Sequence, residues 1–363
     1  MPEAQAYCPD LPLVLERLRA FFLQRRPELI LATMDVPSRV LAGARRSRAA
    51  GYCDYPDPAE RAAFWDAYYA ERAGVPDDSV PAAYLTEMDQ GLYGGLVGGK
   101  VQFMCDPDTG WVSSMVERIL DELGEVANLR FDPDHEWFRR YLNQLDLFVN
   151  QARGKFGVSH FILINGLNFV FELIGATRTY LALFERPDLV EIALELAFEV
   201  NVTVQEAFFA HAGLLAGGTC SNMLQWVPGR IISESVDPFH MTGVDYFEKW
   251  GRPVLERVFG HFDGGGVHIH GNGRHLLEAV STVKGLQGIW LGDDRGFPFA
   301  FEVLPELRAK TGDTPLMTMV PYEQFREALA ARSLVGGVCY RVSGVPDAEV
   351  AKRTMEQVRE YRA

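Results

Sequence analysis

Two spacings of apolar residues follow one another along most of the chain. From about residue 130, segments with an apolar residue every three to four positions alternate with short, mostly apolar runs. The helical spacing predicts helices over 134–153, 186–212, 243–260, 273–283, 302–310, 322–332 and 346–361. The short runs predict strands over 159–166, 213–222, 229–237, 265–271, 286–294, 315–320 and 334–343. This alternation indicates parallel strands joined by crossover helices.

The first 130 residues are less regular. They predict a helix over 11–28 and a strand over 28–35, followed by a loop-rich stretch with many Gly, Pro, Asp and Tyr residues. We therefore expect an N-terminal helical extension over 1–130 and a (β/α)8 TIM barrel over 131–363, to which the early strand adds one strand. No GxGxxG motif follows the early strand, which argues against a dinucleotide-binding fold.

Composition narrows the class of protein. The chain has 35 Lys and Arg against 49 Asp and Glu, a formal net charge of −14, which disfavours nucleic acid as a partner. The most apolar stretch, 161–173, is too short to cross a membrane and contains polar residues. We expect a globular protein with a small-molecule substrate and no membrane association.

Cysteine usage indicates the compartment. The five cysteines are widely spaced, with no CxxC pair, which is typical of free or metal-bound thiols in a reducing compartment. The N-terminus MPEAQAYCPD lacks the basic and apolar regions of a signal peptide. We expect a cytoplasmic location.

Polar residues gather at the predicted carboxyl ends of the strands, where the active site of a β/α barrel lies. These residues are Asp35, Asn165, Cys220, Asn222, Glu234, Asp237, His268, His270, Asp293, Asp294 and Cys339. Asp237 and Glu234 are candidate catalytic carboxylates. Asp35, Asn165, Asn222 and Asp293 are candidate substrate-binding residues.

The motif VHIHGNG, residues 267–273, is the sharpest signal. Residues i and i+2 of a strand face the same side, so His268 and His270 point together and could ligate one cation. Cys339 ends a later strand and could add a thiolate, leaving a fourth position for Glu234, Asp237 or substrate. The alternatives are two hydrogen-bonded histidines without metal and a buried, unreactive Cys339.

Four segments resemble the uroporphyrinogen decarboxylase-like superfamily. They are FILINGLNFVFELIGATRTYLALFERPDLV (161–190), SESVDPFHMTGVDYFEKWGRPVLERVF (233–259), VHIHGNGRHLLEAV (267–280) and GGVCYRVSGVPDAEVAKRTMEQV (336–358). Their order and spacing cover about 230 residues of the chain. The resemblance implies a (β/α)8 barrel.

The methyltransferase branch of that superfamily is the better match. The arginine motif of true porphyrinogen decarboxylases is missing, although Arg39, Arg45, Arg46 and Arg48 lie nearby, and Cys339 stands near the place of their C-terminal histidine. The methyltransferases hold zinc with an HxC pair and a distant Cys. By this resemblance His268 is a zinc ligand, His270 replaces the Cys of the pair, and Cys339 lies close to the distant Cys.

Three functions remain open on the sequence alone. The first is methyl transfer, in which zinc on His268, His270 and Cys339 activates a thiol and a corrinoid (methylcobamide) protein supplies the methyl group. The second is decarboxylation without metal, with Asp237 or Asp35 stabilising a developing cation and the arginines of 39–48 binding carboxylates. The third is a non-catalytic barrel that binds a corrinoid or tetrapyrrole.

Overall fold

The computed structural model describes residues 5–47, 51–106 and 112–363. The α-helices are α1 (Leu11–Phe22), α2 (Arg39–Ser47), α3 (Pro58–Arg72), α4 (Gly91–Gly95), α5 (Glu136–Ala152), α6 (Leu167–Ile174), α7 (Ala176–Glu185), α8 (Pro187–Ala212), α9 (Val244–Tyr246), α10 (Arg252–His261), α11 (Leu277–Ser281), α12 (Leu304–Thr311), α13 (Tyr322–Ala330) and α14 (Ala348–Glu360). Short 3-10 helices cover Thr86–Met88 (η1), Leu123–Asn128 (η2), Asp237–Phe239 (η3) and Gly271–Leu276 (η5), and a π-helical turn (η4) covers Phe247–Gly251.

The strands form three sheets. They are β1 (Ile30–Met34), β2 (Gly51–Cys53), β3 (Ala82–Tyr84), β4 (Val101–Cys105), β5 (Val112–Val116), β6 (Gly157–His160), β7 (Gly218–Ser221), β8 (Gln225–Pro228), β9 (Ile232–Ser235), β10 (Gly265–Ile269), β11 (Leu286–Leu291), β12 (Leu316–Pro321) and β13 (Val338–Ser343). The largest sheet is fully parallel, in the order β1-β13-β12-β11-β10-β9. The second has the order β3-β6-β7-β8, with β8 antiparallel, and β2-β4-β5 is a small antiparallel sheet.

The two larger sheets are linked at both ends. At one end, a parallel bridge pairs Ile162, just beyond β6, with Ser233 of β9. At the other end, the amide of Asp78 donates to the carbonyl of Ala32 on β1, and the Asp78 carboxylate accepts from the amide of Ala32. The second link therefore uses a side chain where a continuous ladder would use backbone.

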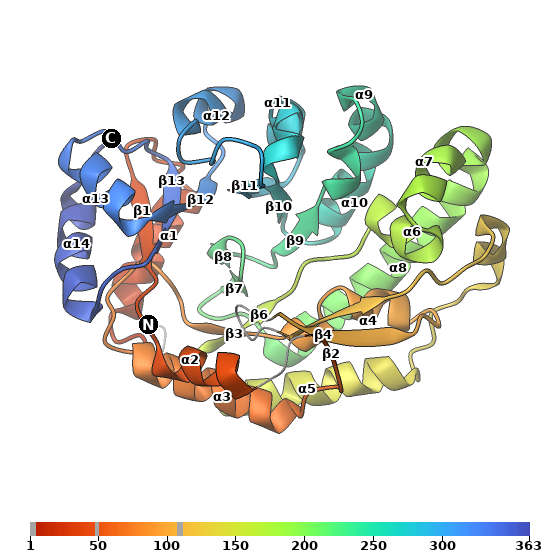
Figure 1. The fold of residues 1–363 in the computed structure, drawn as a ribbon, viewed down its shortest axis with the longest axis horizontal. Helices are drawn as coiled ribbons and strands as arrows, with labels where there is room; N and C mark the ends of the chain where they lie inside the picture. Colours follow the sequence, from red (N-terminus) through yellow and green to blue (C-terminus); the bar gives the residue numbers. More distant parts are fainter. Residues whose placement is uncertain (1–4, 48–50, 107–111) are drawn as a thin grey trace.

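Helices surround these strands (Figure 1). Helices α9 to α14 lie along the six-stranded sheet, while α3, α5 and α8 lie beside the sheet that contains β3 and β6. The large core between helices and strands includes the buried side chains of Phe169, Phe259 and Phe325.

The turn of the β7–β8 hairpin fills the space between the sheets. A Cβ at Gly266 of β10 would lie 2.3 Å from the Leu224 side chain, so only glycine leaves room for that residue. Leu224 packs in a second apolar cluster with Leu15 and Leu18 of α1, Met317 of β12 and other buried side chains. The interior is therefore a packed core.

Most of the predicted elements after residue 130 are present with shifts of a few residues at their ends. The α/β class with a mainly parallel sheet is confirmed, whereas the strand ladder is divided between two sheets instead of forming one continuous barrel. The sequence pattern missed the separate helices α6 and α7. It predicted one helix over 243–260, which the structure divides into α9, the π-helical turn and α10. Among the described residues, no helix has the length and apolarity that crossing a bilayer requires.

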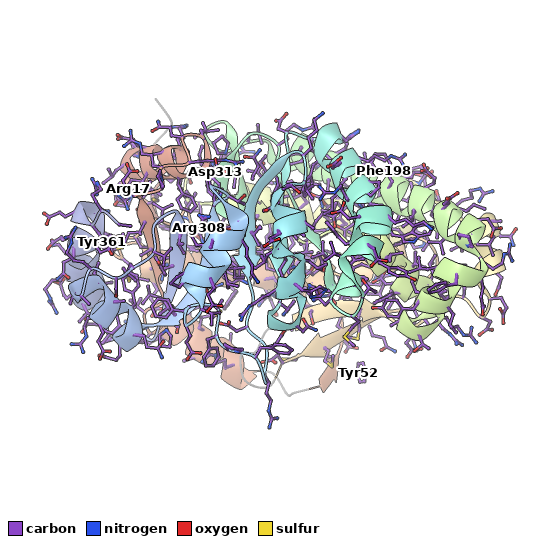
Figure 2. The ribbon with its side chains drawn as sticks, turned by 90° about the horizontal axis from the view of Figure 1, so that it is seen from above. Arg17, Tyr52, Phe198, Arg308, Asp313 and Tyr361 are labelled. Atoms are coloured by element: carbon purple, nitrogen blue, oxygen red, sulfur yellow. The ribbon has the colours of Figure 1, made fainter. Side chains whose placement is uncertain are left out.

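The expected boundary at residue 130 does not separate the strands. β1 pairs with β13, and β3 pairs with β6, so residues before 130 supply two parallel strands. Figure 2 shows Arg17 and Asp313 toward one edge of the molecule and Tyr52 of β2 at the opposite edge. Asp313 lies just before Leu316, the first residue of β12, and so marks the amino ends of the parallel strands. The opposite edge, with Tyr52 and the small sheet, therefore lies toward their carboxyl ends.

Candidate functional site

Three side chains meet at the carboxyl ends of neighbouring strands. One ligating atom each of Asp237, His268 and His270 lies within 4.8 Å of the others, and this is the metal-ligand grouping found among the described residues. His268 Nε2 lies 3.0 Å from Asp237 Oδ1 and 3.3 Å from Asp237 Oδ2. His270 Nε2 lies 3.9 Å from the same Oδ1. The structure thus confirms that the two histidines point together and adds Asp237 to them.

Strand register produces this meeting. His268 lies in β10 beside Ser235 of β9, and Asp237 follows β9 at the start of η3. His270 directly follows β10, and its ring centre lies 5.0 Å from that of His268. Because alternate residues of a strand face the same side, the HxH spacing presents both rings to the turn that carries Asp237.

The electrostatics keep Asp237 ionised. Burial raises the pKa of this carboxyl, but the hydrogen bond and charge of His268, with the charges of His240 and His270, outweigh burial and lower the pKa to about 2. Its side chain is 43% exposed, and that of His270 is 38% exposed. A partly exposed carboxylate anion therefore lies beside two imidazoles.

Asp294 orients His270. This carboxylate follows β11, and its Oδ1 lies 3.0 Å from Nδ1 of His270. An imidazole that donates Nδ1–H to a carboxylate leaves Nε2 free to ligate, which is the usual outer support of a metal-binding histidine. Nδ1 of His268 is buried without a hydrogen-bond partner among the described residues, so only one of the two rings has such support.

His240 is a third histidine at the group. It is 8% exposed, its Nδ1 lies 3.7 Å from Asp237 Oδ1, and its ring centre is 5.7 Å from that of His270. Burial, partly opposed by the Asp237 charge, lowers its pKa to about 4. His240 is therefore neutral near pH 7 and closes the buried side of the group.

The geometry suits a divalent metal ion. Ligands about 2.0–2.1 Å from zinc in a tetrahedral site lie about 3.4 Å apart, between the 3.0 and 3.9 Å measured from Asp237 Oδ1. Asp237 Oδ1 is also buried without a hydrogen-bond partner among the residues described, so a lone pair remains for a ligand. Two imidazoles and one carboxylate leave a position open, as catalytic sites do.

A second polar group lies at the same face. The hydroxyl of Tyr84, at the end of β3, donates to Oδ2 of Asp89 at 2.6 Å. Asn222, which follows β7, hydrogen bonds to Tyr84 through its side chain. Burial raises the pKa of Asp89 to about 6, partly offset by the Tyr84 hydrogen bond and by the charge of His268. Sequence reasoning missed Tyr84 and Asp89 because they lie in the irregular N-terminal stretch.

Glu234 does not face the metal-ligand group. Side chains alternate along β9, so Glu234 points away from the side shared by Ser235 and His268. It is 1% exposed, and its Oε1 accepts from Nδ2 of Asn165 at 2.8 Å. Burial raises its pKa to about 8. The pairing explains Glu234 and Asn165 together as a buried polar contact behind the site.

Cys339 is separated from the two histidines. It lies in β13, whereas they lie in or beside β10, and β12 and β11 intervene. Three strand spacings amount to about 14 Å along the sheet. Cys339 is 4% exposed and packs with Met317 and Leu31, and burial raises its pKa well above the usual range. The expected third ligand is therefore corrected: Asp237, and not Cys339, lies with His268 and His270.

The other predicted residues have separate places. Asp35 follows β1 with an exposed side chain. Asp293 pairs with Arg274 at 3.3 Å and accepts from the amide of Ala300, so it holds the loop after β11 in place. Arg39 pairs with Glu71 and is 98% exposed, while Arg48 lies outside the described residues.

Comparison with known proteins gives structural likenesses but no sequence relatives. No protein-family model matches the chain, and no curated protein matches it. A methyltransferase from Methanosarcina mazei has a similar structure, with a TM-score of 0.59, 11% sequence identity and coverage of 98% of this chain and 99% of that chain. At this identity the likeness shows a shared fold over nearly the whole chain. Membership of the uroporphyrinogen decarboxylase-like superfamily stays a prediction.

Proposed function

We propose that the protein is a metal-dependent methyltransferase whose metal, zinc in the first instance, binds Asp237, His268 and His270. The convergence of these three side chains at strand ends carries the proposal. The fold of the chain also supports the proposal, because a methyltransferase shares it. This ligand set keeps the two histidines expected from the sequence and replaces the thiolate with a carboxylate.

The chain's own residues would prepare the acceptor. When bound, zinc supplies Lewis acidity that lowers the pKa of a coordinated thiol. Asp237 would hold the ion as an anionic ligand, and Asp294 would keep Nε2 of His270 directed at it. The exposed sides of Asp237 and His270 leave a path for the acceptor.

We propose that a corrinoid protein presents the methyl group at this face. Around the group, the loops after β9 and β11 expose Met241 at 77%, Phe299 at 57% and Phe297 at 46%. Exposed apolar side chains in one region favour contact with another macromolecule. We further propose that β1, β3, β6 and β9 to β13 form an eight-stranded barrel, closed by the links at Ile162–Ser233 and Ala32–Asp78.

Decarboxylation of a carboxylate-rich substrate fits this face less well. Buried carboxylates of a substrate need paired cations. The described candidate-site residues carry acidic groups instead, and Arg274 is already paired with Asp293. We therefore expect no turnover of uroporphyrinogen.

Metal content and methyl transfer test the proposal together. We expect about one zinc per chain after reconstitution, and transfer of a methyl group from methylcobalamin to a thiol. Asp237→Asn and His268→Ala should lose both zinc and transfer. His275→Ala is the control, because Nε2 of His275 bonds the carbonyl of Thr242 away from the group. Zinc binding that persists in both Asp237→Asn and His268→Ala would disprove this site.

A further inference from the structure

The second polar group, Tyr84, Asp89 and Asn222, is not used by the proposed metal site. Its members come from the ends of β3 and β7 and from the segment after η1. Because β3, β7 and β9 are all linked in parallel to β6 or to the residue just beyond it, this polar group lies on the same strand-end face as the metal ligands. A substrate held at the metal ligands would therefore meet it.

Not every hydrogen-bonding atom of this polar group has a partner. The Tyr84 hydroxyl donates to Asp89 Oδ2 and accepts from the Asn222 amide nitrogen. Within the described part of the chain, Asp89 Oδ1 accepts from the amide of Gln90 alone, so the carboxylate keeps unused acceptor capacity. Asn222 Oδ1 is buried and has no hydrogen-bond partner among the described residues. Asp89 Oδ1 and Asn222 Oδ1 are therefore open acceptors, which suit a ligand that brings donors.

The charges around this polar group also favour a ligand that is a cation. Asp293 is paired with Arg274, and Asp237 and Asp294 lie beside histidines. By contrast, no Lys or Arg of the described part of the chain pairs with Asp89. If a divalent ion binds as proposed, its two positive charges balance only Asp237 and Asp294. Asp89 then leaves one negative charge over, which one monovalent cation would neutralise.

We propose that Asp89, Tyr84 and Asn222 form a substrate subsite that binds an ammonium group. This inference rests on the proposed function in one respect: it assumes that the strand-end face with the metal ligands is the active site. The N–H groups of the ammonium would donate to Asp89 and to Asn222 Oδ1, and Tyr84 would hold the Asp89 carboxylate in position. A protonated amine supplies both the charge and the donors that the group lacks.

Binding of three small probes of similar size tests the charge and donor requirement. Propylammonium, 1-propanol and propionate are titrated at pH 7.5 into zinc-loaded protein, with binding followed by ligand-observed NMR. We expect propylammonium to bind at least ten-fold more tightly than either other probe. Asp89→Asn should weaken propylammonium at least ten-fold and leave zinc stoichiometry unchanged. Tyr84→Phe should weaken it several-fold.

Asp313→Asn is the charge-matched control, since Asp313 is 71% exposed and pairs with Arg25 before β12, away from this face. Asn222→Asp adds a second carboxylate and should strengthen propylammonium binding several-fold, which keeps the test available if Asp89→Asn does not fold. Equal binding of propionate, or unchanged propylammonium binding in folded Asp89→Asn, would overturn the subsite. Zinc stoichiometry reports on the metal site separately, so the two proposals fail by different measurements.

Discussion

At the scale of single residues, the site depends on which nitrogen of each imidazole is available. His270 offers Nε2 because its Nδ1 faces Asp294, and His268 directs Nε2 at Asp237. A carboxylate that orients an imidazole ring helps to decide whether that ring can bind a metal. Two substitutions separate residues that hold a metal from residues that are merely near it.

Asp294→Asn should weaken zinc binding by about 10- to 100-fold, because the amide orients the His270 ring less firmly than the carboxylate. Competition with a chelator measures the affinity, and thermal unfolding checks that the fold persists. His211→Ala, which removes an exposed histidine–aspartate pair on α8, is the control and should leave zinc affinity unchanged. An unchanged affinity in Asp294→Asn would mean that His270 is not oriented by this contact.

Cys339→Ala should leave zinc binding and methyl transfer intact and lower the free energy of unfolding by about 1 kcal/mol, the cost of a small cavity. The reason is the burial of its thiol with Met317 and Leu31, distant from both histidines. Urea unfolding and metal analysis measure the two effects. Loss of zinc in this variant would restore the thiolate ligand suggested by the sequence.

At the scale of elements, the two faces of β9 have different roles: one faces the metal ligands and the other buries a carboxyl group. Ser235 and then Asp237 serve the metal-ligand side, while Glu234 is buried on the other side against Asn165. A one-residue change in register would exchange these faces. The strand therefore fixes which carboxylate is a ligand and which is a buried, protonatable group.

Glu234 should make the protein less stable as pH rises. Its pKa is raised from about 4.5 unfolded to about 8 folded, so the folded state holds the proton more tightly. That contribution is complete below pH 4.5 and is lost as pH rises through 8, at about 1.4 kcal/mol per pH unit. Urea unfolding at pH 6 and pH 8 measures it. Glu234→Gln should remove most of this slope, and an unchanged slope would assign the effect to another group.

At the scale of the whole molecule, buried carboxylates link β1 to the segment that precedes β3. Asp78 accepts from Arg17 Nε at 2.6 Å and from the amide of Ala32 at 3.0 Å. Asp77 accepts from the amide of Met34 at 2.8 Å and pairs with Arg72. These contacts hold β1 beside the segment before β3, where the two sheets meet.

Asp78→Ala should lower the free energy of unfolding by about 3–5 kcal/mol, because it leaves Arg17 without its partner in a buried place. Asp313→Ala is the matched control: it also breaks an Arg–Asp pair between distant segments, but an exposed one, and should cost less than about 1 kcal/mol. Urea unfolding compares the two variants, whose residues Arg17 and Asp313 are labelled in Figure 2. Equal losses would show that the buried pair is not special.

The sequence alone determined most of the order of strands and helices after residue 130, without α6, α7 and β8, and the common facing of His268 and His270. Both follow from local periodicity, 3.6 residues in a helix and two in a strand. Tertiary structure decided which distant groups join them, because that depends on sheet order and register. The strand order places Cys339 three strands from the two histidines, and the register of β9 with β10 places Asp237 beside them. Because side chains alternate along β9, Glu234 lies on the other face. Asp89 and Tyr84 had no periodic signal, since only the pairing of β3 with the distant β6 places them at the carboxyl ends of the parallel strands.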